Sequence, residues 1–522
     1  MVTAMEPQRR GRSARRRERL TAQEPGNVET LPAYAGGRYL PLSDDDMRRI
    51  HATVLDVLEN IGLIKAIPSM VELVTAKGGS LTDEGRLLFP RDLVEDVIAG
   101  SRRSFTLSGQ SPEHDIELKS QDVYCGTGGA SPNIVDFETG AYRQALLTDL
   151  YDIARLVDQL EHIRFYWRSV VATDMPRAKV LDLNTAYACM MGTTKPIGVS
   201  FANGQHVKTA VEMFDARLGG EGEFRKRPFC TISCCHVVPP LTFAEESLDA
   251  FEMAVRLGMP VLALSAGQAG ATAPAALPGA VVQAVAETLA GLVFGYLIDP
   301  RCRVILGTWP FVSDLRTGAM SGGSGEQALL MAACAQMGNF YDLPTSVAAG
   351  MTDAKVPDSQ SGAEKGYTIG LAAHAGANMI NESAGMLASL LGTAHEAYVM
   401  DNDTLGAVGR TVRGLELNEN SLSIEVIRNV TTEGPGHYLG HDQTLARMQS
   451  DYCYPNVHDR MTPKDWEEAG GRDVRQQARD VTCEILGRHY PDHVDEATDD
   501  RLREAFDIRL DRDAMRPGNG RW

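Results

Sequence analysis

The stretch from residue 345 to residue 383, TSVAAGMTDAKVPDSQSGAEKGYTIGLAAHAGANMINES, decides the fold. It predicts an apolar strand over Thr345–Ala349, a polar loop over Gly350–Gly362, a helix over Ala363–Gly376 and a second strand over Met379–Glu382. Because a helix returns the chain between the two strands, the strands are expected to run parallel. The stretch therefore predicts an α/β fold.

The same unit recurs through the middle of the chain. Further strands are predicted at Asp122–Thr127, Ile163–Val171, Ile197–Phe201, Phe229–Ser233, Val261–Ser265 and Val304–Thr308. Helices are predicted at Leu147–Leu160, Gln205–Leu218, Ala244–Arg256, Ala280–Leu297 and Gly325–Met337. Eight strands at intervals of about 25–45 residues, with helical crossovers, predict a closed (β/α)8 TIM barrel. An open doubly wound sheet is the alternative, but no G-x-G-x-x-G motif opens the first helix.

Segments at both ends lie outside this repeat. We expect a basic flexible arm over 1–37, an N-terminal α/β cap over 38–120, the barrel over 121–400 and a C-terminal helical extension over 401–522. In the cap, Ser43 is placed to cap a helix, and a hairpin is expected near Gly79–Leu88. In the extension, residues 413–450 are expected to be helical and Trp466–His489 to form one long helix.

Composition narrows the possible functions. With 43% apolar residues and a net charge of −18, the chain reads as a globular protein whose main partner is not nucleic acid. No uninterrupted apolar run approaches the length of a membrane span. The nine cysteines show no paired framework, as expected in a reducing cytoplasm. Seven arginines between Arg9 and Arg19 predict a solvated tail, with a docking arm or a targeting signal as alternatives.

Candidate catalytic residues follow the predicted strands, because barrel enzymes carry their chemistry at the carboxyl ends of the strands. The Gly350–Gly362 loop concentrates polar groups, including Asp353 and Lys355, and Glu382 ends the next strand. We expect these three side chains to be catalytic. The alternatives are an ordinary loop that caps the following helix, and a structural carboxylate at Glu382.

Two other polar clusters are weaker candidates. Cys230, Cys234 and His236 share one face of a strand, but their spacing does not fit a structural zinc site, so no metal is expected. A second cluster lies between Glu433 and His441, where glycines and a proline disfavour a helical pair of metal ligands. A lid or interface loop is the expected role of that cluster.

The sequence resembles the trimethylamine methyltransferase family from about residue 35 onward. The likeness rests on several short motifs in a common order: 50-IHA-52, 58-LENIG-62, 135-VDFETG-140, 148-TDL-150, 350-GMTDAK-355, 437-HYLGH-441, 454-YP-455, 459-DR-460 and 466-WEEAG-470. It implies a TIM barrel that transfers a methyl group from a methylated amine to the cobalt of a corrinoid (cobalamin). The corrinoid is carried by a separate protein, so no tightly bound cofactor is expected in this chain. A homo-oligomer is also implied.

One departure from the family shifts the expected substrate. Archaeal trimethylamine enzymes of this family use pyrrolysine, whose counterpart we expect in or near Gly350–Gly362, and this chain holds only standard residues. Relatives without pyrrolysine are associated with quaternary amines such as glycine betaine, proline betaine and carnitine. A quaternary nitrogen needs no further activation because a neutral amine departs. The resemblance therefore implies a quaternary amine as substrate.

A quaternary ammonium is best held by aromatic faces. Trp309, Phe311 and Tyr124 are the aromatics best placed for such a cage. Asp353 or Glu382 would attract the cation, and Lys355 or an amide side chain would bind a betaine carboxylate. Further expected substrate contacts are Gln268, Gly350 and Asn381.

Two other functions remain open at this point. A barrel lyase or hydrolase could use Asp353, Lys355 and Glu382 as acid and base, with Lys355 forming a Schiff base that borohydride would trap. A non-catalytic subunit could bind quaternary amines without methylating cob(I)alamin.

Overall fold

The computed structural model describes residues 34–434 and 436–522. The predicted basic arm, with all its arginines between Arg9 and Arg19, lies outside these residues except for its last few positions.

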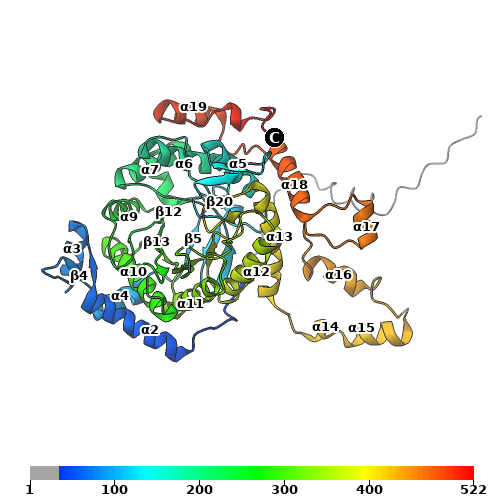
Figure 1. Cartoon of the computed structure of the whole chain (residues 1–522), viewed down its shortest axis with the longest axis horizontal. Helices are drawn as coiled ribbons and strands as arrows, with labels where there is room; N and C mark the ends of the chain where they lie inside the picture. The colour runs from blue at the N-terminus through cyan, green and yellow to red at the C-terminus, as the bar shows by residue number, and fades with distance from the viewer. Residues whose placement is uncertain (1–33, 435) are drawn as a thin grey trace, which may run out of the picture.

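The core is a closed barrel of eight parallel strands (Figure 1). Its ends meet where Gly126 bridges Phe165 and the amide of Arg164 donates to the carbonyl of Cys125 at 2.7 Å. Closure confirms the predicted barrel and excludes the open sheet. In barrel order the strands are β7 (Asp122–Cys125), β10 (Tyr166–Trp167), β11 (Ile197–Val199), β12 (Cys230–Cys234), β13 (Val261–Ser265), β15 (Val304–Thr308), β17 (Thr345–Ala348) and β18 (Met379–Asn381).

Eight helices surround the barrel (Figure 1). They are α5 (Leu147–Asp158), α6 (Ala178–Gly192), α7 (Gly204–Leu218), α9 (Glu245–Leu257), α10 (Leu277–Ile298), α11 (Gly325–Tyr341), α12 (Ser359–His374) and α13 (His395–Arg413). Each follows one strand, so its first turn lies at the carboxyl end of the barrel. Side chains cap several of these first turns; Asn203, Ser324 and Asp358 accept backbone N–H bonds of α7, α11 and α12.

Apolar strands buried on both faces explain the barrel. All five residues of β13, Val261–Ser265, are buried, as expected for a parallel strand between the lumen and a helix layer. At the amino end, the hairpin of β5 (Phe105–Leu107) and β6 (Ile116–Leu118) leads directly into β7 and supplies buried apolar side chains. The short strand β1 (Tyr34–Ala35) pairs antiparallel with β7 from outside the barrel.

The N-terminal elements pack on α10. They include α2 (Asp44–Asp56), α3 (Pro68–Thr75) and α4 (Arg91–Gly100), with the hairpin of β3 (Ser80–Leu81) and β4 (Arg86–Leu88). Ser43 forms the predicted cap of α2, within a capping box closed by Asp46. Helix α10 is long and apolar enough to cross a membrane, but 72% of its most apolar window is buried inside the protein. It is thus a core helix.

The C-terminal part differs from the prediction. The predicted helix Trp466–His489 is two helices, α17 (Pro463–Glu468) and α18 (Val474–Arg488). Gly470 and Gly471 both have positive φ and break it. The described residues between 413 and 450 hold three short α-helices, α14 (Glu419–Leu422), α15 (Ile424–Arg428) and α16 (Asp442–Ser450), rather than continuous helix. A π-helical segment, η3 (Asn429–Glu433), continues α15. These elements and α17 project from the barrel (Figure 1).

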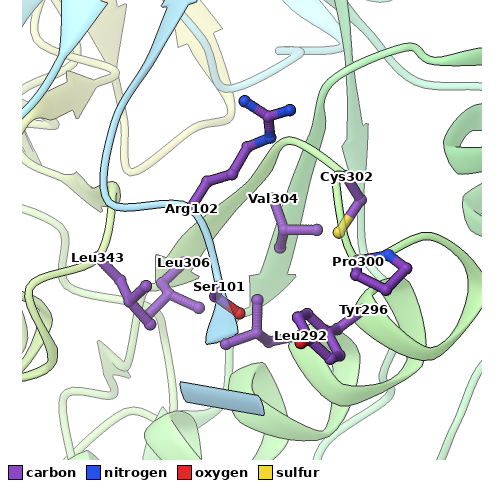
Figure 2. A pocket seen from close by; sticks show the side chains of 9 residues that line it. All are labelled: Ser101, Arg102, Leu292, Tyr296, Pro300, Cys302, Val304, Leu306 and Leu343. Carbon is purple, nitrogen blue, oxygen red and sulfur yellow. The ribbon is translucent and has the colours of Figure 1, made fainter. Parts of the chain in front are cut away.

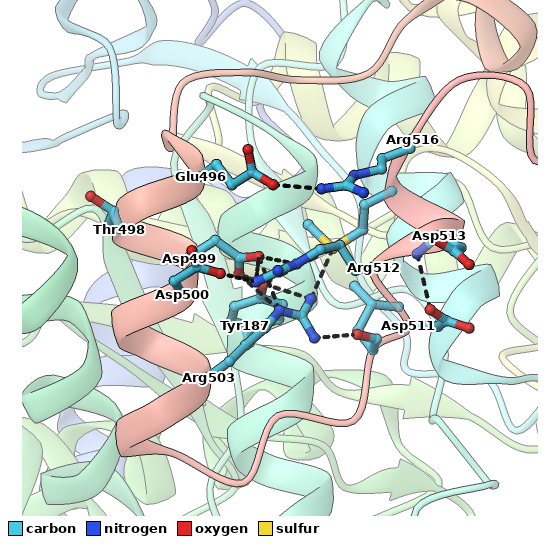
Figure 3. Close-up of polar contacts among 12 residues, drawn as sticks. Tyr187, Glu496, Thr498, Asp499, Asp500, Arg503, Asp511, Arg512, Asp513 and Arg516 are labelled. Carbon is cyan, nitrogen blue, oxygen red and sulfur yellow. Dashed lines mark hydrogen bonds and ion pairs between the residues drawn. The ribbon is translucent and has the colours of Figure 1, made fainter.

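The last helix, α19 (Glu496–Ala505), is fixed to the barrel by a polar cluster (Figure 3). Asp499 accepts hydrogen bonds from the Tyr187 hydroxyl of α6, from Arg503 Nε at 3.0 Å and from Arg512 Nε at 3.0 Å. Tyr187 is fully buried, so the cluster ties the chain terminus to the helix layer.

Candidate active site

A chain of hydrogen bonds joins four strands at the carboxyl end of the barrel. Trp309 Nε1 donates to Ser346 Oγ at 3.2 Å, and Ser346 Oγ donates to Asn381 Oδ1 at 2.8 Å. Asn381 Nδ2 donates in turn to the carbonyl of Thr127 at 3.4 Å. Trp309, Asn381 and Thr127 end or follow β15, β18 and β7, and Ser346 lies within β17. The predicted substrate contacts Trp309 and Asn381 therefore belong to one network. We call this carboxyl end the barrel mouth.

Glu382 lies next to this network and is the most unusual carboxylate of the mouth. Its side chain is 2% exposed, and its Oε2 has no hydrogen-bond partner in the part of the chain that the structure describes. Burial raises the pKa of Glu382 to about 8. The residue also has φ +64°, which costs a non-glycine residue about 1–3 kcal/mol. Burial, strain and an unused oxygen together make Glu382 a candidate functional residue.

Gly350 permits the close approach of two mouth loops. Its φ is +105°, and a Cβ atom there would lie 2.6 Å from the Cα of Ser383 and 3.0 Å from the carbonyl oxygen of Glu382. Only glycine fits this position without displacing the segment that carries Glu382.

A buried ion pair supports the same segment from behind. Lys365 Nζ of α12 lies 2.5 Å from Asp401 Oδ2 of α13, and both side chains are almost inaccessible. The same oxygen accepts the amide of Gly385 at 2.7 Å. The pair therefore holds the 382–385 turn against the helix layer.

Asp353 has its oxygens occupied by the neighbouring loops. Oδ2 accepts from Ser321 Oγ at 2.7 Å, and Oδ1 accepts from the amide of Gly322 at 2.9 Å and from Ser389 Oγ. This arrangement joins three loops. The structure therefore gives Asp353 a loop-bracing position rather than the free carboxylate that general acid–base work needs.

Lys355 lies on the outer side of the same loop. Its side chain is exposed, and its ammonium donates to the carbonyl of Asp353 at 2.5 Å. The structure therefore does not bring Lys355 together with Glu382. The predicted loop is also shorter than expected, because α12 already begins at Ser359.

Phe311 and Gln268 are neighbours beyond the barrel strands. They pair in register where β14 (Gln268–Ala269) and β16 (Phe311–Val312) extend β13 and β15. Gln268 Oε1 accepts from Ser313 Oγ at 3.0 Å, and Phe311 is buried. Both therefore belong to the same side of the mouth as Trp309.

Tyr124 does not lie with the other aromatic residues of the predicted cage. It lies in β7 opposite Met379, below the Asn381 level, and its ring stacks with Arg164 at 5.7 Å. The backbone of Glu117, in the hairpin at the amino end, contacts its hydroxyl. The prediction treated the whole of Asp122–Thr127 as leading to the mouth, whereas Tyr124 points to the opposite end of the lumen.

Sequence reasoning missed several polar groups of the mouth. Trp167 ends β10 and Gln327 lies in the first turn of α11; Trp167 Nε1 and both amide atoms of Gln327 are buried without a partner among the described residues. Cys235 follows β12 at the mouth. Burial raises its pKa, opposed by the charge of Arg168 and assisted by that of Glu382. Because β12 and β18 stand opposite each other in the barrel, the last interaction crosses the lumen.

Two of the side chains considered for a zinc site, Cys234 and His236, face the helix layer. Cys234 contacts the carbonyl of Ser247 in α9, and His236 Nε2 contacts the carbonyl of Glu287 in α10 at 2.9 Å, so both face the helix layer. Within residues 34–434 and 436–522, no three His, Cys, Asp or Glu side chains are grouped to hold a metal ion.

A surface pocket lies at the other end of the barrel (Figure 2). It encloses about 280 Å³ between Arg102, Tyr296, Cys302 and Leu343, close to the amino ends of the strands. Since TIM-barrel chemistry is carried at the carboxyl end, this pocket is not the candidate site.

The chain as a whole matches a family model described as Trimethylamine methyltransferase (MTTB) over residues 8–513. The chain belongs to the trimethylamine methyltransferase family. One relative, the trimethylamine methyltransferase MttB of Methanosarcina thermophila, is 30% identical over 87% of this chain and 94% of that protein. The glycine betaine methyltransferase of Desulfitobacterium hafniense strain Y51 is 26% identical over 89% of this chain and 96% of that protein.

A solved structure supports the fold of this trimethylamine methyltransferase family member. The crystal structure of the Methanosarcina barkeri monomethylamine methyltransferase superposes with a TM-score of 0.51 at 12% identity, covering 86% of this chain and 88% of that one. At this identity the likeness concerns the barrel architecture alone.

Proposed function

We propose that this chain transfers a methyl group from a quaternary amine to the cobalt of a corrinoid carried by a separate protein. The observation that carries the proposal is Glu382, a buried carboxyl with an unused oxygen beside the Trp309–Asn381 network. The family membership and the two kinds of relative, for trimethylamine and for glycine betaine, support an amine as methyl donor.

Methyl transfer from a quaternary amine requires no proton transfer by the protein. A reduced corrinoid supplies a nucleophilic cobalt that accepts the methyl group, while the C–N electron pair stays on the departing neutral amine. The chain must hold the cation, orient one methyl group and exclude water. The hydrogen-bonded network and the buried side chains of Trp309 and Phe311 fit these tasks.

Trp309 and Phe311 would hold the ammonium through their ring faces. Each such contact contributes about 0.5–2 kcal/mol, more where water is excluded. Both rings are buried, and the bond to Ser346 fixes the Trp309 ring. Glu382 would add charge, since a cation nearby favours its ionised form.

Partners follow from the same proposal. The corrinoid protein would approach the barrel mouth, and the chain would act as a homo-oligomer in the cytoplasm. The C-terminal projection, residues 414–470, carries exposed apolar side chains, which support self-association.

The two alternative functions are less well supported. A lyase with a Schiff base would rely on Lys355, which is exposed and bonded to its own loop. Borohydride trapping with a carbonyl substrate should therefore give no adduct at Lys355. A non-catalytic amine-binding subunit would bind glycine betaine yet never methylate cob(I)alamin in the presence of a competent corrinoid protein.

Removing the aromatic faces tests the cage. Trp309→Ala and Phe311→Ala should each weaken glycine betaine binding by about 10-fold or more, because each loses a desolvated cation–π contact. Calorimetric titration measures the change. Trp466→Ala, on the partly exposed α17, is the matched control and should bind as the unaltered protein does. Unchanged binding in both cage variants would remove these rings from the site.

A further inference from the structure

Arg168 is a cation of the barrel mouth with no partner among residues 34–434 and 436–522. It follows Trp167 directly at the carboxyl end of β10 and is only partly exposed. Its guanidinium makes no hydrogen bond or ion pair with any other residue that the structure describes. The guanidinium stays charged at neutral pH, although burial lowers its pKa.

Among the acidic residues, the charge of Asp182 acts on Arg168. Asp182 attracts Arg168, but its Oδ2 accepts the amide of Ala202 at 2.7 Å and His206 Nδ1 at 2.7 Å. The charge of Arg168 also acts on Cys235, which in turn senses Glu382 across the lumen. Arg168 therefore lies in the same mouth as the proposed ammonium site, on the side of β10.

Arg168 is a partly buried cation, and such a charge is costly to leave without an acceptor. An anionic ligand would supply that acceptor.

We propose that Arg168 anchors a carboxylate of the methylated substrate, whose ammonium end lies toward Trp309 and Glu382. The inference rests on the proposed function, because it assigns the second end of the same substrate. It replaces Lys355, which is exposed and outside the mouth, as the carboxylate partner. A planar guanidinium matches a carboxylate through two parallel N–H bonds, and a single cation suits a monoanion. The substrate class is therefore a zwitterion with an acid group.

The test compares acids with the matching alcohols. Glycine betaine and choline differ at one end by a carboxylate in place of a hydroxymethyl group, and a second pair with two more methylenes covers a longer spacing. By calorimetry, the unaltered protein should bind the acid of at least one pair about tenfold or more tightly than its alcohol. Arg168→Gln should weaken that acid by roughly 10- to 100-fold and leave the alcohol unchanged, since only the charged contact is lost.

Controls separate this role from a structural one. Arg177→Gln, an exposed arginine just before α6, should leave both affinities unchanged. Equal affinities within both pairs for the unaltered protein would overturn the proposal without any variant. An equal loss for acid and alcohol in Arg168→Gln would also overturn it. If the acid is preferred but no amine methylates cob(I)alamin, the anion site stands and the methyltransferase proposal fails.

Discussion

Glu382 shows how a single residue combines backbone strain with burial. Glu382 has a left-handed φ of +64° directly after a barrel strand, and its Oε2 meets no donor among the described residues. Such a carboxyl is held neutral until a cation arrives. Binding a quaternary ammonium should therefore release its proton.

This coupling predicts the pH dependence of binding. With a pKa of about 8, Glu382 is mostly protonated at pH 6 and ionised above pH 8. The affinity for tetramethylammonium should rise by up to tenfold per pH unit from pH 6 to pH 8 and then level, because the cation favours the ionised form. Titration calorimetry across this range measures it.

Glu382→Gln should bind tetramethylammonium independently of pH over the same range. Glu138→Gln, at an exposed turn, should keep the slope of the unaltered protein. A slope that survives in Glu382→Gln would assign the titration to another group.

At the residue scale, sequence position identified some of the site and missed the rest for a definite reason. Trp309, Asn381 and Glu382 were found because their strands end where predicted to within a residue or two. Arg168 was missed because the strand was predicted over Ile163–Val171, which places it in mid-strand. The strand in fact ends at Trp167. Pairing decides that boundary, and pairing is not local in sequence.

At the scale of elements, contacts with neighbouring loops determine the shape of the loop after β17. Gly350 lies against Ser383 and Glu382, and Asp353 joins three loops. The 350–362 stretch was expected to carry the chemistry because of its polar groups. Those groups instead hold the mouth in shape, and residues from Ser359 onward are helix. Composition alone does not separate a bracing loop from a catalytic one.

Gly350→Ala tests this tight approach. The Cβ would meet backbone at 2.6 Å in a left-handed conformation, so the protein should lose about 2–4 kcal/mol in its free energy of unfolding. Gly366→Ala is the matched control. It lies in α12 with open space around the new atom and should gain about 0.5–1 kcal/mol. Urea denaturation measures both, and equal stability of the two variants would contradict the packing described.

Glycine also explains the errors at this scale. The break between α17 and α18 lies at two residues with left-handed backbone, Gly470 and Gly471. The spacing of apolar residues, on which the prediction of one helix rested, carries no information about backbone conformation. Helices α6 and α13 were not predicted, so periodicity alone did not mark every helix of the barrel.

At the scale of the whole molecule, the main feature is the exposed apolar surface of the C-terminal projection. The C-terminal projection, residues 414–470, extends away from the barrel (Figure 1). It carries large apolar side chains that the barrel does not bury. Leu415 is 83% exposed and Leu439 is 82% exposed. The others are Leu417, Leu422, Ile424, Ile427, Tyr438, Leu445, Met448, Tyr452, Tyr454, Met461 and Trp466. Exposed apolar surface on this scale is typical of an interface.

The predicted homo-oligomer should therefore depend on this projection. Replacing Leu417 and Leu439 with Asp together should shift the protein toward monomer, because two charges would be buried in the interface. Light scattering after size-exclusion chromatography gives the mass. Gln449→Asp, exposed on α16 in the same region, should keep the oligomer. A monomeric unaltered protein, or an oligomer that survives the double change, would contradict this assignment.

Methyl transfer itself is the most direct test of the account. Cob(I)alamin is mixed with the purified chain and either tertiary or quaternary amines, and methylcobalamin is followed by its absorption spectrum. The account predicts methylcobalamin with at least one quaternary amine, a smaller yield with trimethylamine, and loss of the signal in Trp309→Ala. If no amine in the panel gives methylcobalamin, even after a competent corrinoid protein is supplied, the central claim is contradicted.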